Sequence, residues 1–256
     1  MATQAQIQQY RLASQTLVTL GQSQIRDVLS AFGPSSNPVL VRDALIRYFP
    51  DFMTAFGDTA AVLGADFYDM VRNLPPSAGT VQTVFAQPAK VKQSEGVVRW
   101  AIGSLFAGEW DSFESALLGA SQRLILQPQR ETIDLMAQAD ARSGRVSAVA
   151  WSRQVHPERA RTGKSCDFCI MLAGRGPVYR SQEAAGAVVG RGSDRTGFDA
   201  DGNRLSGGIG GGITTRGLQE RAASFHDECN CTTVPTFYEV QDRPGGRYPQ
   251  VLVPIS

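Results

Sequence analysis

The chain has 256 residues, of which 42% are hydrophobic and 19% charged, and a formal net charge of +1. These values are ordinary for a globular protein with a sizeable core, and the near-neutral charge gives no overall electrostatic case for binding nucleic acid or a membrane. No apolar run approaches the roughly 20 residues that span a bilayer, so we expect no membrane partner.

The N-terminal part of the sequence has helical periodicity. The predicted helices cover residues 3–31, 39–49, 53–74, 94–105 and 110–126, and a further helix follows Pro128. Proline lacks a backbone donor, so we expect Pro50 and Pro128 to separate neighbouring helices. Residues 77–92 are compatible with an extended arm or a short strand. We therefore expect residues 1–142 to form an all-helical domain of five or six helices.

The character of the sequence changes after residue 142. The predicted elements are strands over residues 146–155 and 232–240, a short helix over residues 181–189 and a flexible, glycine-rich loop over residues 190–217. The glycine run in that loop has no Gly-Lys-Ser/Thr ending, which argues against a phosphate-binding loop. We expect a small mixed α/β module over residues 143–241 and a tail over residues 242–256. The predicted fold class is α+β.

All four cysteines occur in two close pairs. Cys166 and Cys169 form a Cys-x2-Cys motif, and His226, Cys229 and Cys231 form a His-x2-Cys-x-Cys motif. Loops with this spacing present thiolates and an imidazole to a tetrahedral metal ion, most often zinc. The polar N-terminus lacks a secretion signal, and synthesis in a reducing cytoplasm favours metal over disulfides. We therefore predict a structural zinc site that closes the long insertion between the two pairs.

Several alternatives for these residues stay open. The ligands are either four thiolates, or three thiolates with His226. Two disulfides or free thiols in a small core would also place the cysteines close together. A catalytic zinc would need a carboxylate base, and Asp227 and Glu228 are equally well explained as loop residues. A Cys166–His226 nucleophilic pair is a further alternative. His156 lies in the most basic local run of the chain, which is either a solvated loop or a contact for phosphate or an acidic partner.

These motifs resemble a known family. The Cys-x2-Cys motif, residues 172–179, a variable insertion and the His-x2-Cys-x-Cys motif before a proline-containing strand resemble the head morphogenesis domain of tailed bacteriophages. The chain looks like a MuF-like minor capsid protein of the type found in phages of actinobacteria, over residues 145–240 by motif and over the helical part by layout. Asp227 and Asn230 replace a proline and an arginine usual in that family. The ligand set is kept, but the case for contact with packaged DNA is weakened.

The resemblance implies a virion protein that is made in the host cytoplasm and packaged inside the head. Its partners would be the portal protein and capsid subunits, and we expect no catalytic residues and no turnover chemistry. The main rival is a capsid maturation protease, in which His156 would have to act with a nearby serine. No G-x-S-x-G or H-E-x-x-H stretch supports that rival. A toxin-like transferase or nuclease and a helical binding module outside a virus are further alternatives.

Overall fold

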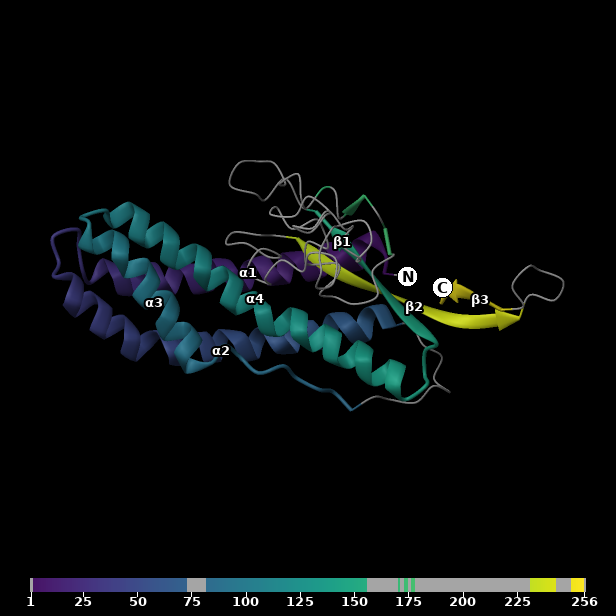
Figure 1. Cartoon of the computed structure of the whole chain (residues 1–256). Coiled ribbons are helices and arrows are strands. Elements are labelled where there is room, and N and C mark those ends of the chain that lie inside the picture. Colours follow the sequence, from purple (N-terminus) through teal and green to yellow (C-terminus); the bar gives the residue numbers. More distant parts are fainter. Residues whose placement is uncertain are drawn as a thin grey trace, which may run out of the picture. The chain divides into compact units, whose positions relative to one another are not determined.

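The computed structural model describes residues 2–72, 82–155, 231–242 and 250–255, together with positions 170, 173, 174, 176 and 177. This described part is a mixed α+β chain with four helices and a three-stranded sheet (Figure 1). The chain divides into two compact units, Met1–Ser147 with Pro254–Ser256, and Ala148–Val253. The four helices belong to the first unit, and the paired strands β1 and β2 belong to the second.

The first unit is a helical bundle. Its elements are α1 (Gln4–Ser30), α2 (Pro38–Arg72), α3 (Val91–Phe106) and α4 (Trp110–Arg142). The two long helices α2 and α4 pack on each other, and α1 and α3 each pack on both of them. All four helices contribute to one hydrophobic core, whose buried members include Ile25, Leu45, Phe49, Val98, Phe113, Leu117, Leu124 and Ile125. Among the described residues, no helix has the length and hydrophobicity needed to cross a membrane.

The helix starts follow local sequence signals. Thr3 caps α1, because its Oγ1 accepts from the Gln6 backbone N–H at 3.2 Å while the Thr3 N–H donates to Gln6 Oε1 at 2.7 Å. Asn37 Oδ1 accepts from the Val39 N–H at 2.9 Å at the start of α2, and Pro38 occupies the first helical position. An asparagine cap followed by a first-turn proline, a start signal visible in the sequence, therefore marks the beginning of α2.

The prediction that Pro50 and Pro128 separate helices is wrong. Pro50 lies inside α2 and Pro128 inside α4, so the predicted five or six helices are four in the described residues. A proline in a helix interior costs about 3 kcal/mol. Burial of a large apolar side chain contributes about 1.5–3 kcal/mol, and Phe49 and Met53 around the first proline are both buried. Packing on both sides of each proline thus offsets the lost hydrogen bond.

Glycine allows close packing along α2. An added Cβ at Gly64 would collide with the backbone carbonyl of Gln129 on α4, and one at Gly57 would lie 2.7 Å from Pro88 Cβ. Pro88 belongs to residues 82–90, which form an extended arm without strand pairing. Of the two alternatives predicted for residues 77–92, an extended arm or a short strand, these residues agree with the arm. The Ala86 N–H donates to Thr132 Oγ1 at 2.9 Å, which attaches this arm to α4.

The sheet of the second unit has the strand order β1-β2-β3. Its strands are β1 (Ala148–Gln154), β2 (Thr232–Asp242) and β3 (Gln250–Pro254). β1 and β2 are antiparallel, with Trp151 opposite Pro235 and Gln154 opposite Thr232. Both predicted strands are thus present, and β2 continues through Pro235. β3 lies within the expected tail. The predicted helix over 181–189 and the glycine-rich loop over 190–217 are outside the described residues.

Candidate functional site

Most of the predicted zinc ligands lie outside the described residues. This is true of Cys166, Cys169, His226 and Cys229, whereas Cys231 directly precedes β2 and is buried. Within the described part of the chain, no group of three or more histidine, cysteine, aspartate or glutamate side chains is arranged to hold a metal ion. The metal site remains a prediction, and the protease candidate His156 also falls outside the described residues.

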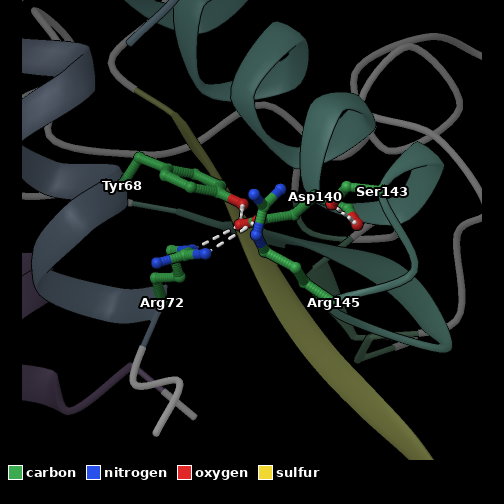
Figure 2. A network of polar contacts seen from close by, with 5 residues as sticks. All are labelled: Tyr68, Arg72, Asp140, Ser143 and Arg145. Carbon is green, nitrogen blue, oxygen red and sulfur yellow. Dashed lines mark hydrogen bonds and ion pairs between the residues drawn. The ribbon is translucent and has the colours of Figure 1, made fainter. Parts of the chain in front are cut away.

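A buried polar cluster joins α2 to α4. We call it the Asp140 cluster; its members are Tyr68, Arg72, Asp140, Ser143 and Arg145 (Figure 2). The carboxylate of Asp140 has no exposed surface. Tyr68 Oη donates to its Oδ2 at 2.5 Å. Arg72 donates from Nε to Oδ2 and from Nη2 to Oδ1, the second bond at 2.8 Å. Because this pairing is bidentate, the last turn of α2 is held at one point on α4.

The same aspartate anchors the turn that ends α4. Gly144 has a φ of +72°, and its N–H donates to the Ala141 carbonyl while the Arg145 N–H donates to the Asp140 carbonyl, each at 3.2 Å. This is the Schellman arrangement, in which an apolar contact usually accompanies the two bonds. Here a charged contact takes that place, since Arg145 Nη1 lies 3.9 Å from Asp140 Oδ1. Ser143 Oγ adds a bond to the Asp140 carbonyl at 2.9 Å.

The electrostatics of the cluster follow from burial around one carboxylate. Burial, reinforced by the hydrogen bond to Asp140, raises the pKa of Tyr68 well above its ordinary value. The hydrogen bond to Asp140 raises the pKa of Arg72. The tyrosine therefore stays neutral, and both carboxylate oxygens are engaged by donors. Such a carboxylate is held as a structural acceptor, and the cluster fixes the ends of two helices rather than presenting a reactive group.

A second polar chain crosses the bundle near the N-terminus. Gln129 Nε2 on α4 donates to Ser14 Oγ on α1 at 2.7 Å, and Ser14 Oγ donates to the Tyr10 carbonyl at 2.7 Å. The Tyr10 ring stacks on Phe67 of α2 with centroids 4.0 Å apart, and burial raises the pKa of its hydroxyl. These contacts also serve packing, because the Gln129–Ser14 bond joins α4 to α1 and the Tyr10–Phe67 stack joins α1 to α2.

Sequence reasoning did not identify the Asp140 cluster. The available signal is that Asp140 follows Ile133, Met136 and Ala137 at helical steps on the buried side of α4. An acid at such a position must be paired, because an unpaired buried charge is costly. Arg72 lies far away in the sequence, however, and only the fold brings it to Asp140.

The described part of the chain thus defines an α+β protein with a helical bundle, a separate small sheet and a buried polar cluster of structural type. A family model described as VG15 protein matches residues 1–253. The chain belongs to this family, which consists of phage gene products. Neither the curated proteins nor the solved structures yield a match.

Proposed function

We propose that this chain is a structural minor capsid protein of a tailed bacteriophage, packaged inside the head and associated with the portal protein and capsid subunits. The observation that carries the proposal is the match to a phage protein family along residues 1–253. The resemblance of the cysteine and histidine motifs to MuF-like head morphogenesis domains supports the capsid role in particular.

The described structure supports a binding role. The bundle has a continuous core contributed by four helices. Its most buried ionic group ties helix ends together and has its oxygens engaged by donors. Several large apolar side chains remain on the surface of the bundle, including Leu40, Trp100 and Phe106, each more than half exposed. Single exposed apolar side chains are common on protein surfaces, and we propose that these ones contribute to contacts within the assembled head.

We also propose that a structural zinc ion closes the insertion before β2, with ligands drawn from Cys166, Cys169, His226, Cys229 and Cys231. Thiolate and imidazole ligands fit zinc by their softness and by their spacing. The buried position of Cys231 beside the first residue of β2 supports a structural ligand. Zinc would hold the two ends of the insertion together, at either a four-thiolate or a mixed site.

The proposed capsid role is tested on virions and procapsids. A phage carrying an epitope-tagged copy of the gene should yield virions that contain the chain, and chemical cross-linking of those virions should join it to the portal protein. Absence of the chain from both virions and procapsids would overturn the capsid role.

The protease alternative gives a different result. Co-expression with the capsid protein would then produce processed capsid subunits, and His156→Ala would abolish the processing. Unprocessed subunits in the presence of the wild-type chain support the structural role.

A further inference from the structure

The outer face of α3 carries a line of exposed residues with an unusual composition. Lys92, Gly96, Arg99 and Gly103 follow one another at steps of four, three and four residues, and all four are exposed. We call this line the basic stripe. Trp100 borders it with 61% of its surface exposed. The stripe is therefore a basic helix face that includes two glycines and has a large aromatic side chain at its edge.

The two glycines of the basic stripe have no role in the packing of the bundle. A Cβ added at Gly96 or Gly103 would meet nothing within 4 Å, whereas one at Gly64 of α2 would collide with α4. Glycine inside a helix destabilises it relative to alanine, and no contact within the bundle requires glycine at these two open positions. Close approach of a second molecule to the helix backbone would explain why these positions carry no side chain.

The outer face of α2 carries a line of opposite charge. We call it the acidic stripe; its exposed members are Asp51, Ala55, Asp58, Val62 and Asp66. No basic residue occurs on α2 between positions 48 and 71, so Asp58 and Asp66 have no cation within one turn on their own helix, whereas Asp51 follows Arg47 by four residues. Val62 is 48% exposed and lies in the middle of the acidic residues. This face combines negative charge with a small apolar centre.

The two stripes are complementary in charge and spacing. Lys92 and Arg99 are seven residues apart, as are Asp51 and Asp58, so each pair spans about 10.5 Å of helix. In each stripe a small residue, glycine or alanine, lies between the charges. Arg99 is paired with Glu95 at 3.2 Å on its own helix, but this pair is exposed and therefore exchanges readily with another carboxylate.

We propose that the basic stripe of one copy of this chain docks on the acidic stripe of a second copy. The contact uses two different faces of the same molecule, because α3 and α2 each present an outer face beside their mutual packing. Head-to-tail contacts of this kind build rings when the rotation closes and filaments when it does not. The charge pairs set the partner and the register, and the glycines let the two helices approach.

The test measures self-association of the full chain by sedimentation velocity over a range of protein and salt concentrations. We expect wild-type oligomers that dissociate at high salt. The double variants Lys92→Glu/Arg99→Glu and Asp51→Lys/Asp58→Lys should each weaken self-association about tenfold or more, because like charges then face each other. An equimolar mixture of the two variants should assemble again, since each reversed face meets a complementary one. The control Asp27→Lys/Asp111→Lys makes the same change in net charge as the Asp51/Asp58 variant, at exposed sites on α1 and α4, which carry neither stripe.

A second pair of variants separates docking from folding. Gly96→Ala and Gly103→Ala should leave the thermal unfolding midpoint unchanged or raised, yet weaken self-association about tenfold. A wild-type chain that is monomeric at low salt and high protein concentration overturns the proposal, as does a mixture of the charge variants that fails to assemble. Binding of some other protein to α3 without self-association also counts against a second copy as the occupant.

Discussion

Replacing Asp140 by asparagine removes the one carboxylate to which Tyr68, Arg72 and Arg145 converge. Asparagine retains an acceptor oxygen for the tyrosine, but its amide group is a donor and faces the donors of the arginines. Removing one partner of a buried ion pair costs about 3–5 kcal/mol. The side chains of Arg72 and Arg145 are 14% and 27% exposed and regain some hydration. We therefore expect a loss of about 2–3 kcal/mol in the free energy of unfolding.

The assay is thermal unfolding followed by far-UV circular dichroism, which reports mainly the four helices. A unit of about 150 residues loses about 2–4 °C per kcal/mol, so the midpoint should fall by about 5–10 °C. The matched control is Glu114→Gln, which removes an exposed pair with Arg26 between α1 and α4 and should cost less than about 0.5 kcal/mol. Equal, small losses for both variants would refute the view that the Asp140 cluster holds the bundle together.

A double-mutant cycle with Tyr68→Phe refines this prediction. The hydroxyl of Tyr68 donates to Asp140 Oδ2 at 2.5 Å, so the two substitutions should be coupled by about 1.5–3 kcal/mol, the range for a hydrogen bond to a charged group. Additive losses would mean that the tyrosine and the aspartate act independently.

Three further predictions concern the buried tyrosines, two glycines of the bundle and the proposed zinc site. Because burial raises the pKa of Tyr10 and Tyr68, the folded chain keeps protons that the unfolded chain releases above about pH 10, and the free energy of unfolding should fall by about 1.4 kcal/mol per pH unit for each tyrosine. Urea unfolding at a series of alkaline pH values measures this slope, and a Tyr68→Phe variant with an unreduced slope would contradict the assignment. Gly64→Ala should destabilise the bundle by about 1–3 kcal/mol, because its Cβ meets the backbone of α4. Gly96→Ala, on an open helix face, should instead stabilise it by about 0.5–1 kcal/mol in urea unfolding, and the same sign for both variants would be inconsistent with the packing. Elemental analysis of protein purified without chelator should show stoichiometric zinc that Cys231→Ser diminishes, with helical content retained, and zinc-free protein with an unchanged fold would exclude the site.

The helices of the bundle were predictable wherever the signal is local. Alternation of apolar residues gave their approximate positions, and Asn37 with Pro38 gave the start of α2. The continuation of α2 through Pro50 was not predictable. The destabilisation of a helix by proline depends on the local sequence, whereas the burial that offsets it depends on the other helices of the core. Phe49 is buried by residues of other helices, and the sequence does not state which helices those are.

The candidate sites divide in the same way. The spacing of Cys229 and Cys231 is visible in the sequence and predicts metal chemistry without any structure. The pairing of Arg72 with Asp140 joins residues that are 68 positions apart, and no local sequence pattern predicts it. The stripes on α2 and α3 were also hidden, because an outer helix face is defined only after the inner face has been packed.

The order of residues therefore determined the division into a helical part and a strand-containing part, the caps that start two helices and the set of thiol and imidazole groups available to a metal. The tertiary structure decided which prolines are tolerated, where the buried carboxylate finds its donors and which charged faces remain open. The physical reason is that periodicity and capping depend on residues a few positions apart. Burial and ion pairing depend on groups that meet only when the chain has folded.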